Sequence, residues 1–239
     1  MSSAVANFDR STWVLPPLVV CAVMWAIRPV EPRLAAGSVE PGLPAAGGSL
    51  AVLGGLRAVA AGGCWLRANL AWERQDPAAT ARLLELTVAT DARPVYFWLN
   101  GARMMAYDFP EWRAAGAPVA VREKIGREEV GRALAFLERG LAGHPAKAEF
   151  YLEMANIHLR ALGDREGAAR LFRLAAEQPG APWHAARIHA ELLRGLGRPA
   201  EALAWLRRIL PTLPANDPAA RREVVVQRIA ELERETAGR

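Results

Sequence analysis

Lysine is nearly absent from this chain, although basic residues are not. Lys124 and Lys147 are the only lysines among the 30 basic residues of a 239-residue sequence, so arginine carries almost all of the positive charge. The net charge of +5 is spread among acidic residues and forms no basic block, which argues against a dedicated nucleic-acid patch. We interpret the charges as a solvated, salt-bridged helix surface.

Cysteine is scarce as well. Cys21 and Cys64 stand in apolar or helical surroundings without ligand spacing, and we interpret both as packed side chains. The sequence also lacks a phosphate-binding glycine loop, a dinucleotide-binding fingerprint, an HExxH motif and the local signatures of a Ser or Cys nucleophile. These absences predict that the protein is not an enzyme, and that it uses no cofactor and no small-molecule substrate.

Histidines are the remaining candidates for a metal or acid–base cluster. His184 and His189 are five residues apart and therefore point about 140° apart on a helix. Two ligands on one helix face need a spacing of three or four. We predict no metal site, and we interpret all four histidines as ordinary surface or packed residues: His144, His158, His184 and His189.

A run of 17 uncharged, mostly apolar residues extends from Ser11 to Ile27, with Trp13 and Trp25 near its ends. As a helix it would be about 25 Å long, close to a hydrocarbon core of roughly 30 Å, and tryptophans favour the two interfaces. We predict a transmembrane anchor over residues 1–28. A cleaved signal peptide and a buried soluble helix are the alternatives.

Residues 29–48 are rich in Pro, Gly, Ala and Ser, which is typical of a linker. Charges on the two sides of residues 11–27 nearly balance, so they do not determine the orientation of the anchor. We expect a single-pass protein of the bacterial inner membrane whose folded part, residues 49–239, lies in the periplasm.

A recurrence of 34 residues marks the C-terminal half. Small residues, leucines and arginines return at this interval, which is typical of stacked helical hairpins that bury their apolar faces against one another. Alanines at equivalent positions would let neighbouring helices approach closely, and glycines would allow the turn between them. The matched positions are Leu159, Arg160, Leu162, Gly163, Ala168 and Arg173 with Leu193, Arg194, Leu196, Gly197, Ala202 and Arg207.

Residues 149–214 resemble two tetratricopeptide repeats (TPR). The resemblance rests on small residues at Ala168 and Ala202, bulky residues at Phe172 and Leu206, and a closing Pro214. It departs from the family pattern in the first helices, where Leu152, Asn156, Ala186 and Ala190 replace the expected aromatic and glycine positions.

Earlier hairpins follow from the same spacing. Residues 129–145 predict the second helix of a hairpin whose first helix is residues 94–107. The insertion between them, residues 108–126, contains an aromatic segment at 109–112 that we expect to pack over the stack, with a role in recognition as the alternative.

The two ends of the repeat region are also predicted to be helical. Residues 61–74 and 77–90 form another predicted hairpin, with Asp76 as cap and Pro77 at the first helical position. Residues 218–236 predict a capping helix with a polar outer face. The predicted fold is all-α: a right-handed α-solenoid of stacked, TPR-like helix-turn-helix hairpins, with an N-terminal transmembrane helix.

The resemblance implies that the first helix of each hairpin lines a partner-binding groove. Because arginine binds carboxylates bidentately, the arginines of this groove predict a partner with an acidic or C-terminal-carboxylate feature. The function we predict is a membrane-anchored protein–protein interaction scaffold that helps assemble a larger complex, and an RNA-binding repeat protein with an arginine-lined groove is the alternative. The predicted groove residues are Asn100, Arg103, Phe150, Glu153, Ile157, Arg160, His184, Arg187, Glu191 and Arg194.

Overall fold

The computed structural model describes residues 54–237, which are helical and contain no β-strand. The predicted anchor, residues 1–28, and the linker, residues 29–48, lie outside the described residues. Within the part of the chain that is described, no helix combines the length and the apolar character needed to cross a membrane. The all-α class is therefore confirmed for residues 54–237. The chain divides into two compact units, and the boundary falls between Phe97 and Trp98.

The first unit contains the predicted hairpin of α4 (Gly54–Glu73) and α5 (Pro77–Thr90). Asp76 accepts a hydrogen bond from the Ala79 amide and Pro77 opens α5, so the predicted cap is confirmed. Trp65 packs on the rings of Tyr96 and Phe97 at 5.3 and 5.4 Å between centroids.

The second unit begins inside α6 (Val95–Arg103) and continues through a π-helical turn, η2 (Met104–Asp108), into α7 (Phe109–Arg113) and α8 (Val119–Gly143). The predicted insertion is thus largely helical, and α8 begins ten residues before the predicted start. Phe109 is buried, which confirms the expected packing of this residue. Because η2 is a π-helical turn, helical structure continues from Val95 to Arg113, past the predicted end at residue 107.

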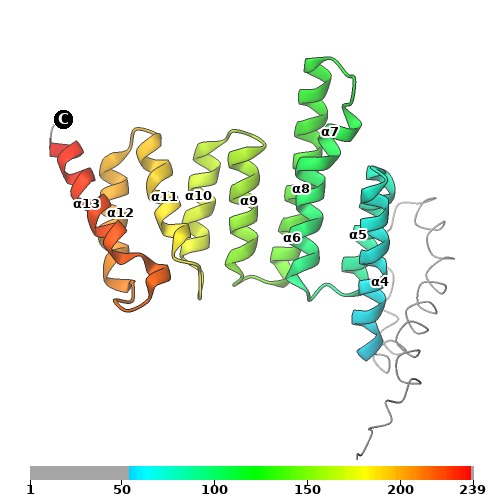
Figure 1. Ribbon diagram of the computed structural model, residues 1–239, viewed down its shortest axis with the longest axis horizontal. Helices are drawn as coiled ribbons and strands as arrows, with labels where there is room; N and C mark the ends of the chain where they lie inside the picture. The colour runs from blue at the N-terminus through cyan, green and yellow to red at the C-terminus, as the bar shows by residue number, and fades with distance from the viewer. Residues whose placement is uncertain (1–53, 238–239) are drawn as a thin grey trace, which may run out of the picture. The chain divides into compact units, whose positions relative to one another are not determined.

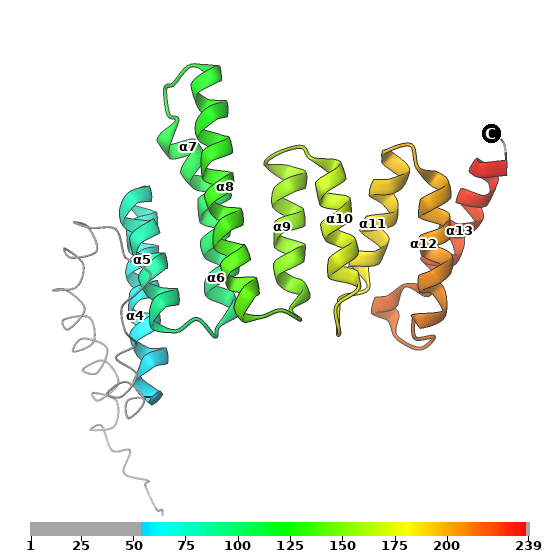
Figure 2. The same ribbon diagram turned by 180° about the vertical axis from the view of Figure 1, so that it is seen from behind.

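The next four helices form the two hairpins that the 34-residue recurrence predicts. They are α9 (Ala148–Arg160), α10 (Arg165–Ala176), α11 (His184–Gly195) and α12 (Pro199–Ile209). Each packs on the next one along the chain, and Figures 1 and 2 show them side by side in chain order. Gly163 and Gly197 have φ of +66° and +76°, the left-handed conformation that the predicted turns require.

The chain ends in the predicted capping helix. Short 3₁₀ turns, η3 (Leu210–Thr212) and η4 (Pro218–Ala220), lead into α13 (Arg222–Ala237), which packs on α12. The core of this end includes the fully or almost fully buried Ala202, Leu206, Val225 and Leu232.

Candidate partner-binding surface

Three of the ten predicted groove residues meet between α6 and α9. The Arg103 side chain donates from Nε and Nη2 to Oε2 of Glu153 at 2.9 and 2.5 Å, and from Nη1 to Oδ1 of Asn100 at 3.5 Å. Glu153 is 4% exposed, whereas half of the Arg103 side chain reaches solvent. The buried carboxylate therefore holds the guanidinium in a fixed position at the surface, and the same hydrogen bonds raise the pKa of Arg103.

Tyr107 belongs to the same cluster, although it is not among the predicted residues. Burial, and then the negative charge of Glu153, raise the pKa of the Tyr107 phenol, while the charges of Arg160 and Arg103 oppose this shift. The phenol is therefore a neutral hydrogen-bond donor near pH 7 and lies close to both arginines. Its spacing of seven and four residues from Asn100 and Arg103 is the sequence signal that could have identified it.

Arg160 ends α9 and is exposed. It has no ion-pair or hydrogen-bond partner among residues 54–237, so its guanidinium donors face solvent. Arg160, the half-exposed Arg103 and the Tyr107 phenol therefore provide several hydrogen-bond donors and a positive charge at this end of the surface. We call Asn100, Arg103, Tyr107, Glu153 and Arg160 the Arg103 cluster.

Phe150 and Ile157 also lie on α9, but both side chains are fully buried. Phe150 stacks on the imidazole of His144 at 5.4 Å between centroids. Neither residue presents surface to a partner in this conformation. Their role in partner binding stays a prediction, and the structure places them in the packing between helices.

Three of the four predicted residues of α11 contact the C-terminal segment, residues 218–237. Arg187 donates to the carbonyl oxygen of Ala220 at 2.9 Å. Glu191 pairs with Arg228 at 2.6 Å, and Arg194 pairs with Glu235 at 2.9 Å. His184 is exposed, and its pKa is lowered by partial burial and by the charge of Arg187, so it is neutral near pH 7.

A second concentration of positive charge lies at the start of this row. Burial and then the charge of Arg221 lower the pKa of Arg187, while the charge of Glu223 opposes this shift. Arg221 is also one of two non-glycine residues with positive φ in the described chain, at +47°. Eight of the ten predicted residues thus fall into two groups: four belong to the Arg103 cluster, and the other four form the α11 row, His184, Arg187, Glu191 and Arg194.

The other histidines have local partners. His144 bonds to the carbonyl oxygen of Gly140 at 2.8 Å, and His158 bonds to Asp164 at 2.9 Å. His189 is buried. Across residues 54–237, no three His, Cys, Asp or Glu side chains are grouped so as to hold a metal ion.

No protein-family model matches the sequence, and no curated protein aligns with it significantly.

Proposed function

We propose that the chain is a non-enzymatic scaffold that binds a protein or peptide partner and helps assemble a larger complex. In this proposal the helical hairpins form a right-handed α-solenoid of the TPR type. The 34-residue recurrence supports it, because the period coincides with two successive hairpins, α9–α10 and α11–α12. Ala168 and Ala202 are both fully buried at the equivalent position of these hairpins.

The Arg103 cluster is the observation that carries the proposal. A buried carboxylate fixes one arginine at the surface, and a second arginine and a phenol with free donors lie beside it. Preorganised donors of this kind recognise a carboxylate at a low entropic cost. The partner we propose has an acidic or C-terminal-carboxylate feature that binds here, with Arg187 and Arg221 as a second contact for negative charge.

The membrane location is a further part of the proposal. Residues 11–27 would anchor the chain in the inner membrane of a bacterium, and the linker would hold the helical units near the bilayer, on the periplasmic side. The absence of charged residues from positions 11–27 and the tryptophans near both ends support this location.

Co-purification of the full chain from gently solubilised membranes tests the proposal. We expect a protein partner in stoichiometric amount, and we expect Arg160→Glu to lose it because the substitution reverses the charge of an exposed arginine in the Arg103 cluster. Arg165→Glu is the matched control, since Arg165 is also exposed but begins α10 and lies outside the predicted surface.

Recovery of free monomer alone, or equal partner recovery with both variants, would count against the proposal. Recovery of RNA whose retention falls steeply with salt, without a stoichiometric protein, would favour the RNA-binding alternative.

A further inference from the structure

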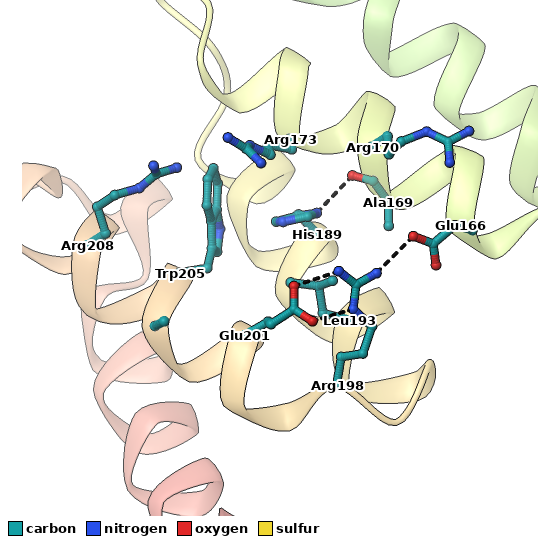
Figure 3. A pocket seen from close by; sticks show the side chains of 11 residues that line it. Glu166, Ala169, Arg170, Arg173, His189, Leu193, Arg198, Glu201, Trp205 and Arg208 are labelled. Atoms are coloured by element: carbon teal, nitrogen blue, oxygen red, sulfur yellow. Dashed lines mark hydrogen bonds and ion pairs between the residues drawn. The ribbon is translucent and has the colours of Figure 1, made fainter.

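A pocket of about 350 Å³ lies among α10, α11 and α12, and none of its lining residues belongs to the ten predicted groove residues. Its volume is within the range of small-ligand sites. Figure 3 shows Arg198 reaching toward Glu166 and Glu201, and Arg173 near Trp205 and His189. All three helices therefore contribute side chains to one concave site.

The base of the pocket is rigid. Trp205 donates from Nε1 to the carbonyl oxygen of Ala186 at 3.0 Å, and His189 Nδ1 bonds to the carbonyl oxygen of Ala169 at 2.8 Å. The Trp205 and His189 rings meet edge to face at 4.7 Å between centroids, and each residue is 6% exposed. Because a carbonyl only accepts, Nδ1 carries the proton of a neutral imidazole. Burial lowers the pKa of His189, which favours this neutral form.

One side of the pocket carries more negative than positive charge. Arg198 donates to Glu201 from Nε and Nη2, each at 2.5 Å, and to Glu166 from Nη1 at 2.8 Å. Two carboxylates therefore share this one guanidinium, and Arg198 has little capacity left for a ligand.

The other side has an excess of positive charge. Arg173 and Arg208 share a single carboxylate, Glu177, at 3.0 and 3.3 Å. The Arg208 guanidinium also lies over the Trp205 ring at 4.4 Å from its centroid, which restricts its position. Arg170 lines the same pocket and has no ion-pair or hydrogen-bond partner within the described part of the chain.

We propose that this pocket binds an oxyanion, a carboxylate or a phosphate group, beside Arg173 and Arg208. Two guanidiniums that share one carboxylate leave several N–H donors without a protein acceptor, and an oxyanion with two or more oxygens accepts from both in parallel. Arg170 supplies a further charge. The residues are held by Glu177 and Trp205 before binding, so little side-chain entropy is lost when the anion binds. This site is separate from the proposed partner-binding surface.

Isothermal titration of the full chain in detergent tests the site, with inorganic phosphate and succinate as probes at constant ionic strength. We expect saturable binding of at least one anion, weakened by added salt. Tighter binding of phosphate would identify a phosphate-bearing ligand, and tighter binding of succinate a carboxylate ligand.

Arg208→Gln and Arg207→Gln form a matched pair of variants. Both arginines are exposed on α12 and each makes an ion pair, Arg208 with Glu177 and Arg207 with Glu233, but Arg208 lines the pocket and Arg207 does not. We expect Arg208→Gln to weaken binding roughly tenfold and Arg207→Gln less than about twofold.

Arg170→Gln is a second variant of the pocket, and loss of this exposed side chain removes no ion pair from the described chain. We expect it to weaken binding as well, by less than Arg208→Gln. No saturable binding of either anion to the wild-type chain would overturn the proposal. So would equal affinity of the wild type, Arg170→Gln and Arg208→Gln.

Discussion

The hairpin of α6 and α8 and the hairpin of α9 and α10 share one packing pattern but differ at their far ends. In both, buried residues in the second helix follow each other at intervals of four and three. In both, the first of these residues is a fully buried alanine. The residues are Ala133, Leu137 and Gly140 in α8, and Ala168, Phe172 and Ala175 in α10.

The far ends are built differently. The α9–α10 hairpin closes with the short turn at Gly163, whereas η2, α7 and the first part of α8 extend the other hairpin. In Figures 1 and 2, α7 and the start of α8 project beyond α9. Glu129 is buried where this extension begins and accepts hydrogen bonds from Arg113 and Arg132. The buried positions therefore determine which helices pair, while an insertion is accommodated beyond them with its own polar network.

The largest expected effect is at the packing pattern itself. A Cβ at Gly140 would lie 2.5 Å from Cε1 of Phe150 and 2.8 Å from Cδ2 of Trp98, and both rings are buried. We expect Gly140→Ala to lower the free energy of unfolding by about 2–3 kcal/mol through overpacking. Urea unfolding followed by circular dichroism measures the change.

Gly143→Ala is the control, because nothing lies within 4 Å of a Cβ at that position of the same helix. It should leave the stability unchanged or raise it by up to about 1 kcal/mol, as alanine favours helix. Equal destabilisation by the two variants would contradict the close approach of α6, α8 and α9.

A smaller effect is expected at the extension. Glu129→Gln removes the charge that Arg113 and Arg132 share, and we expect a loss of about 2 kcal/mol. Hydrogen exchange should show faster opening of α7 and the first half of α8, while the amides of α10 stay protected. If the amides of α10 exchange faster to the same degree, the Glu129 network also stabilises the α9–α10 hairpin, and the two hairpins do not open independently.

The next largest loss of stability is expected at the turn of the α9–α10 hairpin. Gly163 has a φ of +66°, so alanine there should cost about 1 kcal/mol because its Cβ disfavours the left-handed conformation. Gly195→Ala, within α11, meets nothing within 4 Å and serves as the comparison in the same unfolding experiment. A Gly163→Ala variant as stable as the wild type would contradict the turn geometry.

Periodicity was sufficient for the regular part of the fold. The hairpins of α9 to α12 and the α5 cap were predictable, because each depends on local spacing and on residues with one strong preference, such as Gly163 and Pro77. The helical insertion was not, since a π-helical turn at Met104–Asp108 has no distinct sequence pattern and allowed α6 to continue into α7.

The site was predictable only in part. Helix faces identified Asn100, Arg103 and Glu153, which do meet, but they also selected Phe150 and Ile157, which are buried. Helical periodicity shows which residues share one face of a helix, but it does not show whether neighbouring helices bury that face. The pocket around Arg173 and Arg208 joins three helices through side-chain contacts, so no single spacing in the sequence could reveal it.

The smallest expected effect depends on pH and concerns the packing of α11 on α10, where His189 bonds to the carbonyl oxygen of Ala169. Burial lowers the pKa of His189 below 6.5, and the unfolded chain binds the proton near that ordinary value. Unfolding therefore takes up a proton at pH values just below 6.5, and stability falls as the pH drops through this range. Urea unfolding at about pH 7.5 and about pH 5.5 should show a smaller pH dependence for His189→Gln than for the wild type. An unchanged dependence would contradict a buried neutral His189.

Site-specific photocrosslinking in the native membrane tests the central claim most directly. A photoreactive residue at Arg160, in the Arg103 cluster, or at His184, in the α11 row, should crosslink to the same partner protein. The same residue at Ala200, which is exposed on α12 outside the predicted surface, should give no such product. Equal crosslinking of the partner from Ala200, or no protein product from Arg160 and His184, would contradict the account.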